Sequence, residues 1–424
     1  MGCSSHIHEV LQTPVCGRYD VIVAGGGPAG TGAAISAARL GKKVLLIERY
    51  GFLGGNWTAA LVNPFPYVQY EERGGIVHEI VNRLKAEGAW GGWIDRCFDF
   101  EAMKRLLDTM MIEAGVDLLL HSWVADVVKD DNQVTGVIVE NKSGRGAWLA
   151  DVVIDCTGDG DAAARAGAEF VVGRASDGLT QPMTLMFKIS GTNFNQTDKS
   201  ELFEMFREVV EREGLDYDYN FRHPYVLVLP GKDKAICQIT HIRRLNGADA
   251  RDLTEAEIEG RRRVYAVFNL MKRHIERFAD IELEETGSQI GVRESRRILG
   301  DYVLIKEDLE QGRQFEDGIV DCFNHMDIHE PDGEDMVYHR VEPYQIPYRC
   351  LLPKGLDGIL TAGRCISGTH ESLAAYRLSG VCVALGQGAG TAASLALDTG
   401  TTVREISIPI LRESLIKQGV LGLD

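Results

Sequence analysis

The chain has 424 residues, and its 45 Lys and Arg against 62 Asp and Glu give a formal net charge of −17. Hydrophobic residues make up 45% and charged residues 25%, which excludes a disordered chain, and the length suffices for two or three domains. The negative charge argues against a nucleic-acid partner, since a phosphate backbone needs a basic surface. The 47 glycines exceed the average usage of about 7%.

The cysteines and the most apolar segment bear on the compartment. Nine cysteines occur, none in a CxxC spacing, so we predict reduced and mostly buried thiols instead of a disulfide framework. Residues 1–10 lack the basic and apolar regions of a signal peptide. Residues 378–397 are uncharged but rich in Gly, Ala, Ser and Thr, which favours a closely packed buried helix over a membrane span. We therefore expect a soluble, cytoplasmic protein without a membrane partner.

The first third of the chain alternates strand and helix patterns. A short apolar run at 19–24 is followed by an Ala-rich helical stretch at 28–40 and a second apolar run at 43–47. This strand, helix, strand order favours parallel pairing of the two strands. Further on, the patterns predict a helix at 100–114 and strands at 116–128, 134–140 and 151–156, with a turn at 130–132.

After about residue 170 the chain becomes more charged and more aromatic. Two long helices are predicted at 198–213 and 254–278, with short strands at 185–190, 225–229 and 235–242. The apolar pattern returns with a strand at 359–362 and the uncharged helix. We predict an α/β nucleotide-binding domain split into residues 17–165 and 343–424, interrupted by an α+β substrate or cap domain at 166–342.

A glycine-rich turn carries the strongest local signal. Residues 25–30 read Gly-Gly-Gly-Pro-Ala-Gly and fit GxGxxG directly between the first strand and the first helix. The glycines permit a tight turn, close approach of a pyrophosphate and close helix–strand packing, while the helix N-terminus attracts phosphate. Glu48 ends the second strand, where a carboxylate can bind the ribose hydroxyls and disfavours a 2′-phosphate. The pattern predicts dinucleotide binding.

Three further segments make the chain resemble the glutathione-reductase-type flavoproteins. Residues 54–58 (Gly-Gly-Asn-Trp-Thr) resemble their double-glycine motif, 153–158 their "ATG" strand end, and 359–364 the strand that contacts the ribityl chain. Arg364 stands where Asp is usual in that last motif. The resemblance implies FAD as the cofactor. Because no His precedes the glycine pair at the position used by covalently flavinylated relatives, we expect the FAD to be non-covalent.

The chain resembles more closely the broad group of FAD-dependent oxidoreductases that are distantly similar to fumarate-reductase flavoproteins. Residues 158–167, 291–300 and 362–367 carry this resemblance. It implies a Rossmann-type, glutathione-reductase-like FAD-binding domain with an inserted α+β domain. Motif and resemblance together predict a cofactor site made of Gly25, Gly27, Pro28, Ala29, Gly30, Glu48, Arg49, Gly55, Asn56, Thr58, Val124, Thr157, Gly158, Gly160, Asp161, Gly363, Arg364, Ser379, Gly380 and Val381.

Three residues are candidates for catalysis. Arg377 begins the uncharged helix, where positive charge could face the flavin, although plain helix packing is the alternative. Arg293 could hold a substrate carboxylate, sharing a helix face with Arg297, or these arginines could pair with Glu294 to join the domains. His370 is the candidate acid or base because it lies near a cofactor motif in sequence, and a structural histidine fits equally well.

Two other segments have competing interpretations. The histidines at 325, 329 and 339, with Asp327 and Glu330, are irregularly spaced, so we predict a solvated polar loop and no metal site. The strand at 181–186, Gln-Pro-Met-Thr-Leu-Met, either lines the flavin or belongs to the core.

We predict an FAD-dependent dehydrogenase or oxidase that transfers a hydride between a small organic metabolite and FAD. The alternatives are a flavin-dependent C=C reductase and a partner-dependent flavoprotein whose FAD is largely structural. The electron acceptor, the substrate and the oligomeric state, a homo-oligomer included, stay open at this stage.

Overall fold

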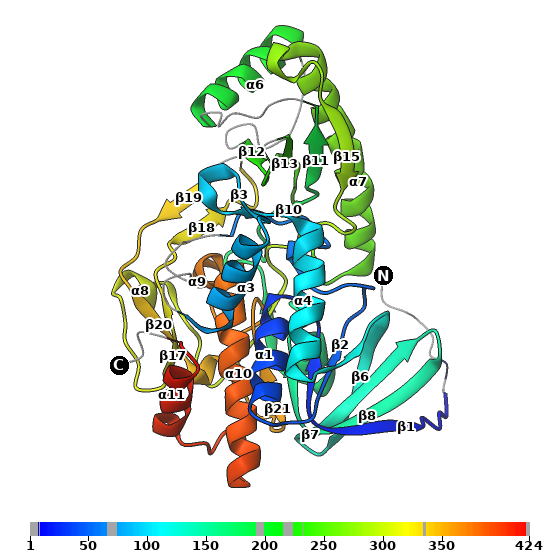
Figure 1. Ribbon diagram of the computed structural model, residues 1–424, viewed down its shortest axis with the longest axis vertical. Coiled ribbons are helices and arrows are strands. Elements are labelled where there is room, and N and C mark those ends of the chain that lie inside the picture. The colour runs from blue at the N-terminus through cyan, green and yellow to red at the C-terminus, as the bar shows by residue number, and fades with distance from the viewer. Residues whose placement is uncertain are drawn as a thin grey trace.

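A computed structural model of the protein describes residues 7, 9–65, 74–191, 199–214, 224–231, 233–333 and 336–420. Its largest sheet has seven strands in the order β5-β2-β1-β8-β7-β6, with β21 paired to the end of β8 (Figure 1). These strands are β1 (Val15–Ala24), β2 (Val44–Ile47), β5 (Asp117–Leu119), β6 (Ser122–Asp130), β7 (Gln133–Asn141), β8 (Gly144–Asp155) and β21 (Ile359–Thr361). Strands β5, β2, β1, β8 and β21 run parallel, whereas β6, β7 and β8 form an antiparallel meander. The predicted mixed α/β fold with a parallel sheet is confirmed.

Alternate residues of the parallel strands face opposite sides of the sheet. Val21 and Val23 of β1 pack into the hydrophobic cluster that contains α1 (Pro28–Arg39) and α10 (Ser379–Thr399), on one side. Ile22 and Ala24 pack on the other side, with α5 (Asp161–Ala166) and the meander. Because both faces are covered, these strands are apolar at every position, as parallel strands usually are.

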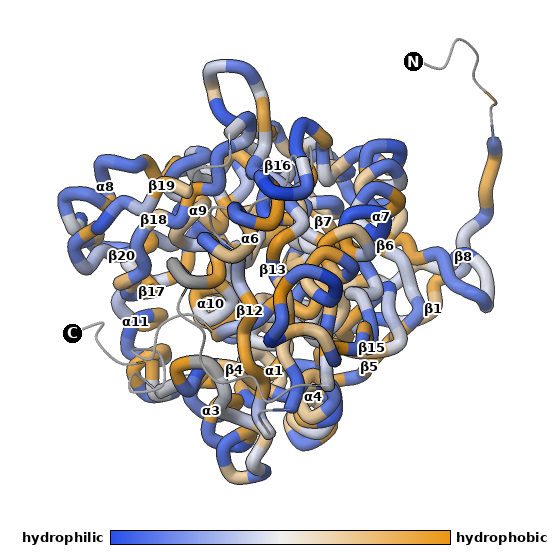
Figure 2. Tube along the Cα trace, turned by 90° about the horizontal axis from the view of Figure 1, so that it is seen from above, coloured by the Kyte–Doolittle hydropathy of each residue, from blue (hydrophilic) through white to orange (hydrophobic). Residues whose placement is uncertain are grey.

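Helices α1 and α10 approach each other to backbone contact because glycine lies where they cross. A Cβ added to Gly32 would lie 2.1 Å from the carbonyl oxygen of Val383, and one added to Gly386 would lie 1.9 Å from that of Ala29. Helix α10 is long and apolar enough to cross a membrane, but 89% of its most apolar window is buried within the protein. The prediction of a buried helix packed through its small residues is confirmed, and Figure 2 shows the hydrophilic segments gathered at the rim of the molecule.

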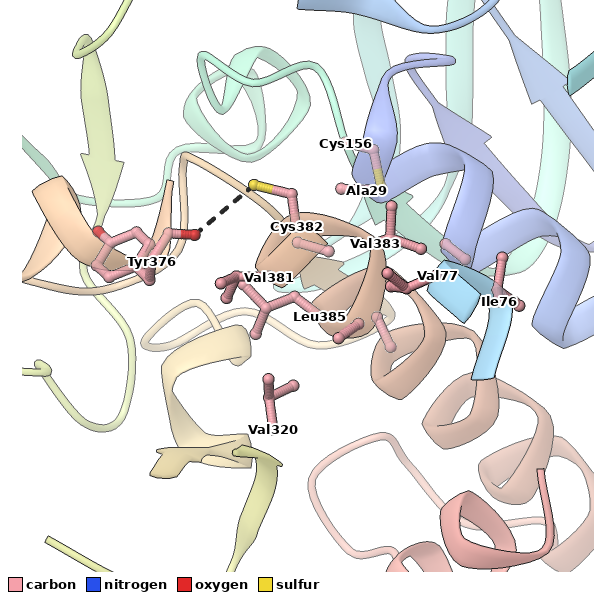
Figure 3. Packing of buried hydrophobic residues seen from close by; sticks show 14 of the residues in the cluster. Ala29, Ile76, Val77, Cys156, Val320, Tyr376, Val381, Cys382, Val383 and Leu385 are labelled. Atoms are coloured by element: carbon pink, nitrogen blue, oxygen red, sulfur yellow. Dashed lines mark hydrogen bonds between the residues drawn. The ribbon is translucent and has the colours of Figure 1, made fainter. Parts of the chain in front are cut away.

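The start of α10 meets two other segments of the cofactor motifs. Figure 3 shows Cys382 beside Ala29 of α1 and Cys156, which follows β8. The thiol of Cys382 donates to the carbonyl oxygen of Tyr376 at 3.7 Å. Cys156 and Cys382 are among the eight free cysteines of the described residues, seven of which are buried. Sequence segments from both ends of the chain therefore converge at one point of the core.

A second hydrophobic cluster occupies residues 183–292 and forms the upper part of Figure 1. Its antiparallel sheet has the order β12-β13-β11-β15. The strands are β11 (Phe187–Ser190), β12 (Tyr225–Val228), β13 (Lys234–Gln238) and β15 (Glu282–Thr286), covered by α6 (Lys199–Glu213) and α7 (Ala250–His274). Both predicted long helices are present, but α7 begins at Ala250 instead of 254 and ends at His274, before the short helix Glu276–Phe278. The single strand predicted at 235–242 is divided into β13 and β14 (His241–Ile242), which belong to different sheets. The first residue predicted for α6, at 198, lies outside the described residues.

Most of the remaining elements pack into the first hydrophobic cluster, whereas β10 and β14 belong to the second. The remaining elements are α3 (Gly75–Ala86), β3 (Trp90–Gly91), β4 (Cys97–Phe98), α4 (Phe100–Ala114), β9 (Phe170–Val172), β10 (Met183–Thr184), β14 (His241–Ile242), β16 (Arg296–Ile298), α8 (Lys306–Glu310), β17 (Gly318–Cys322), β18 (Met326–His329), β19 (Met336–His339), β20 (Tyr344–Pro347), α9 (His370–Tyr376) and α11 (Ile408–Lys417). Strand β17 pairs with β20, so an antiparallel pair spans the domain boundary expected at residue 342. Helix α4 has the predicted bounds.

Candidate active site

The glycine turn after β1 is shaped by contacts that leave no room for side chains. Gly25 has φ +102°, and a Cβ there would lie 2.5 Å from the carbonyl oxygen of Cys156. A Cβ on Gly30 would lie 1.9 Å from the carbonyl oxygen of Gly25 itself. Helix α1 then begins with Pro28 at its first position, and Gly27 is its N-cap. The free N–H groups of this helix N-terminus therefore face the carboxyl edge of the parallel sheet.

Glu48 lies at the same edge, directly after β2, and is buried with 5% exposure. Its carboxylate accepts hydrogen bonds from the backbone N–H groups of Gly26 at 2.7 Å and Tyr50 at 2.9 Å. Burial raises the pKa of Glu48, and the two N–H donors partly offset this rise. The acid is thus fixed beside the glycine turn with lone pairs left for a ligand.

The second glycine pair lies opposite the first. Gly54 and Gly55 have φ +109° and +50°, and they begin the single-turn helix Gly55–Trp57. A Cβ built on Gly27 would meet only the Cα of Gly55, at 3.8 Å. A Cβ built on Gly55 would lie 2.9 Å from the Cα of Gly27, so the two glycine turns touch through their backbones. Both glycines line the cavity described below, and we call the part of it beside them the cofactor channel.

Asp155 organises the end of β8. Its buried carboxylate accepts hydrogen bonds from the N–H and the hydroxyl of Thr157, at 3.0 and 2.7 Å, and from the N–H of Ala163 at 2.8 Å. Burial raises the pKa of Asp155 to about 6. This network fixes the turn at Thr157 and Gly158 against α5, a role that the sequence motif did not reveal.

Arg364 follows β21, where the resemblance expected Asp. Its guanidinium pairs with Asp159 at 2.8 Å and donates to the carbonyl oxygen of Val292 at 2.9 Å. The departure at position 364 is therefore accompanied by a carboxylate on the neighbouring loop.

One large cavity, of about 890 Å³, runs along this edge and continues beneath the second hydrophobic cluster. Most of the predicted cofactor residues line it, namely Gly25, Gly27, Pro28, Ala29, Glu48, Arg49, Gly55, Asn56, Thr157, Gly158, Gly363, Arg364 and Ser379. A smaller pocket beside Glu48 is lined by Val124 and Asp161 together with Trp123. The guanidinium of Arg49 lies 5.2 Å from the ring centroid of Trp123.

Other predicted residues do not line either space. Gly30 lies in the first turn of α1, and Gly160 is the N-cap of α5. The hydroxyl of Thr58 donates to the carbonyl oxygen of Leu53 at 2.6 Å. Gly380 and Val381 lie in the first turn of α10, directly after Ser379, which lines the cavity. The strand at 181–186 serves both interpretations, because Thr184 and Met186 line the cavity while its other apolar residues are buried in the core.

The two candidate arginines both reach the cavity, from different segments. Arg377, the C-cap of α9, donates to the backbone oxygen of Asp327 at 2.9 Å. Arg293 donates to the backbone oxygen of Pro182 at 2.7 Å and to the hydroxyl of Thr184 at 2.6 Å. Residues 292–295 are not helical, so the expectation that Arg293 and Arg297 share a helix face is wrong.

His370 does not line the cavity. It is buried, with Nδ1 2.8 Å from a carboxylate oxygen of Glu294. Glu294 is fully buried, pairs with Arg297 and accepts a hydrogen bond from the N–H of Gln181 at 2.9 Å. Arg297 in turn donates to the backbone oxygens of Gly368 and Gly173, at 2.9 and 2.7 Å. This network joins four separate segments, which is the structural alternative foreseen for these arginines.

Strand β18 brings two polar residues to the cavity that the sequence interpretation placed in a solvated loop. His329 is 3% exposed, so that interpretation is wrong for it. Its Nε2 lies 3.5 Å from Oδ2 of Asp327, and both residues line the cavity. The alternation Asp-Ile-His, with a period of two, is the signal that could have placed both side chains on one face of a strand.

The charges in this cluster influence one another. Burial lowers the pKa of His329 to about 4, and the guanidinium of Arg293 adds to this effect while Asp327 opposes it. Burial raises the pKa of Asp327, but His329 and the two arginines outweigh it and hold the value below its usual range. Burial and the nearby Arg377 lower the pKa of Arg293 to about 9. At neutral pH the cluster therefore holds two cations, one carboxylate and a neutral imidazole.

Comparison with known protein families gives one match over most of the chain. The family described as FAD dependent oxidoreductase matches residues 20–415.

Curated relatives match shorter segments. A thiamine thiazole synthase of Methanococcus aeolicus is 33% identical over 150 residues, covering 33% of this chain and 55% of that protein. A dihydrolipoyl dehydrogenase of Trypanosoma brucei brucei is 55% identical over 79 residues, covering 19% of this chain and 16% of that protein. The chain thus spans about half the length of the thiazole synthases it matches.

Solved structures align over nearly the whole chain at low identity. A flavin-dependent brominase aligns with a TM-score of 0.49 at 14% identity, covering 95% of this chain and 83% of that one. A geranylgeranyl bacteriochlorophyll reductase-like protein of Thermoplasma acidophilum has a TM-score of 0.47, with the same identity and coverage.

Proposed function

The chain belongs to the FAD dependent oxidoreductase family, and from that premise we propose that it oxidises a small organic metabolite by transferring a hydride from the substrate to non-covalently bound FAD. The observation that carries this proposal is the single cavity that joins the glycine-lined edge of the sheet to a buried polar cluster. A cofactor channel and a place for a second molecule are thus parts of one space.

The residues at the sheet edge fit FAD. Gly25, Gly27 and Gly55 bring backbone instead of side chains to the cavity wall, as close approach of a pyrophosphate requires. Glu48 lies where the ribose hydroxyls would need an acceptor, and the pocket at Val124 and Trp123 offers an apolar and aromatic surface for adenine. We propose the cofactor residues named from the sequence as the binding site, with Gly30, Thr58, Gly160, Gly380 and Val381 acting through the backbone shape of the site.

When bound, FAD accepts the electron pair and hydrogen of the substrate C–H bond. The chain supplies positive charge near the far end of the cavity, from Arg377 and from the N-terminus of α10, at which Ser379 lines the wall. Burial lowers the pKa of Arg377, yet the carboxylate of Asp327 opposes this effect. We propose that this positive potential favours reduction of the bound cofactor.

The polar cluster suits the oxidation of a substrate, because it holds a neutral imidazole at the cavity wall. Burial lowers the pKa of His329 to about 4, so this side chain is neutral over the physiological range. A neutral imidazole accepts a proton, as the oxidation of an alcohol requires. A purely structural role for FAD is disfavoured by the cavity continuing beyond the cofactor channel.

We also propose that residues 17–165 and 343–424 form the split cofactor-binding part and that 166–342 carries the substrate side. The compact second cluster at 183–292 supports a cap over the cavity. The pairing of β17 with β20 ties the later part of 166–342 to the cofactor side.

The test is an anaerobic screen of the purified yellow protein against a metabolite library, with loss of visible flavin absorbance as the signal. Bleaching by at least one metabolite, and recovery when an acceptor is added, is the expected result. A protein that retains FAD but is bleached by no alcohol, amine or acid would contradict the proposal. Recovery in air within seconds would assign an oxidase, and slow recovery a dehydrogenase.

A further inference from the structure

The polar cluster at the end of the cavity assembles side chains from three separate parts of the chain. Arg293 comes from the segment after β15, Asp327 and His329 from β18, and Arg377 from the end of α9. Arg377 lies 3.9 Å from Oδ2 of Asp327, which lies 3.5 Å from Nε2 of His329. All four line the same cavity. Three of them, Arg377, Asp327 and His329, are therefore direct neighbours in the cavity wall.

Several polar atoms here have no hydrogen-bond partner within the described part of the chain. They are Nε of Arg377, Oδ1 of Asp327 and Nδ1 of His329. The side chains of Arg377 and His329 are only 9% and 4% exposed. Buried polar groups are nearly always satisfied, and an unsatisfied one carries a free-energy cost to the folded protein. A polar ligand that pairs with these atoms would remove that cost.

The charge of the cluster indicates the sign of that ligand. Two guanidiniums face one carboxylate, and His329 is neutral, so the balance is positive inside a chain of net charge −17. Among the other groups near it, Tyr225 stays neutral because burial raises its pKa to about 12, and Arg243 adds positive charge to the field at Arg293. His241 packs edge-on against His329, with ring centroids 4.9 Å apart, and Tyr338 also lines the cavity.

We propose that the substrate is a 2-hydroxy acid, whose carboxylate pairs with Arg293 and Arg377 and whose hydroxyl proton passes to Nδ1 of His329. This inference rests on the proposed oxidation of a metabolite by bound FAD. The substrate C–H bond breaks and its electron pair and hydrogen go to FAD; the O–H bond breaks and its proton goes to His329; a C=O bond forms, giving a 2-oxo acid. Nε2 of His329 faces Asp327, whose carboxylate stabilises the imidazolium.

The charge balance distinguishes a hydroxy acid from an amino acid. A 2-amino acid brings an ammonium group, which would place a further positive charge among two arginines and a protonatable histidine. A hydroxyl is neutral and donates one hydrogen bond, which matches the acceptor left open on His329. Arg377 would pair with the substrate carboxylate and would also add positive potential near the cofactor. Arg293 has only the first of these roles, so a substitution there tests carboxylate binding alone.

The first test measures binding without turnover. Calorimetric titration of the FAD-bound protein with benzoate and with benzamide, a neutral ligand of the same shape, should show benzoate binding about 10- to 100-fold more tightly. Arg293→Gln should remove most of this preference and Arg293→Lys should restore part of it, while the control Arg207→Gln, on the exposed face of α6, should leave it unchanged. Equal affinity for the two ligands in the unaltered protein would overturn the proposal.

The second test follows reduction of the bound FAD by 2-hydroxy acids, by their methyl esters and amides, and by simple alcohols. The free acids should reduce it at least tenfold faster than the esters and amides. His329→Gln should slow reduction about 10²- to 10⁴-fold while benzoate still binds. Faster reduction by neutral alcohols would overturn the hydroxy-acid assignment while supporting the proposed function. If the protein binds FAD and, in the first test, benzoate, yet none of these compounds bleaches the flavin, both proposals would be overturned.

Discussion

The two ends of the cavity are built in opposite ways. The cofactor end uses backbone, and its critical residues lie in short motifs such as 25–30 and 54–58, where a Cβ at most of the glycines would lie 1.9 to 2.9 Å from a neighbouring atom. The polar end uses side chains, and its members stand alone at 293, 327, 329 and 377. A site that binds through backbone shape leaves a contiguous sequence signature, whereas a site assembled by the fold leaves scattered residues of ordinary appearance.

The largest effect is expected at the cofactor end. There, one glycine substitution should disrupt the fold, whereas a second one nearby should weaken only ligand binding. Gly30→Ala places a Cβ 1.9 Å from the carbonyl oxygen of Gly25, so we expect loss of soluble protein or a large drop in melting temperature. Gly27→Ala meets nothing closer than 3.8 Å and has an extended backbone, so the apoprotein should melt as the unaltered one does.

FAD binding shows the separate role of Gly27. We expect Gly27→Ala to bind FAD at least tenfold more weakly, because the added methyl group enters the channel that the pyrophosphate would occupy. Fluorescence titration of the apoproteins with FAD measures this, and unchanged affinity would show that the channel is not the phosphate site.

A smaller effect is expected behind the polar end. Glu294→Gln leaves the buried guanidinium of Arg297 without its counter-charge, which should cost about 3–5 kcal/mol in the free energy of unfolding. His370→Asn should cost less, because it leaves the ion pair of Glu294 with Arg297 in place. Denaturant unfolding measures both.

His370 also tests the boundary of the catalytic cluster. Since its side chain does not line the cavity, His370→Asn should lower stability but change the rate of FAD reduction by less than about threefold once folded protein is compared. A loss as large as that expected for His329→Gln would return His370 to the catalytic residues.

The smallest effect is a dependence of stability on pH that belongs to the polar end. The pKa of His329 is about 4 in the folded protein, against 6.5 for an unperturbed histidine, so the unfolded chain takes up a proton first as pH falls. Stability from this group is present above pH 6.5 and is lost toward pH 4, by an amount of order 1–3 kcal/mol. Asp155, whose pKa is raised to about 6, acts in the opposite direction. The difference in unfolding free energy between the unaltered protein and His329→Gln, measured across this range, isolates the histidine.

Sequence patterns predicted the α/β fold, the parallel sheet and the burial of α10 because these follow from local periodicity and from apolar strands. They did not find Asp327 and His329, since a charged residue between hydrophobic ones fits a surface strand or loop as well as a cavity wall. They placed His370 at the site by distance along the chain, whereas Glu294 draws its side chain into the scaffold. The extra length of β8 was missed because its first half is stabilised by pairing with β7 and with the start of β1, residues 15–18, which precede the predicted strand.

The contact of α1 with α10 has a consequence for how the protein is made. Helix α1 holds the first cofactor motif, yet much of the surface that covers it comes from residues 379–399, which are synthesised long after it. At about 5–20 residues per second, the glycine turn waits for tens of seconds before its partner exists. Until residues 379–399 have emerged, nascent chains therefore expose part of the apolar face of α1, and chaperone capture of chains truncated before residue 379 should exceed that of the 424-residue chain.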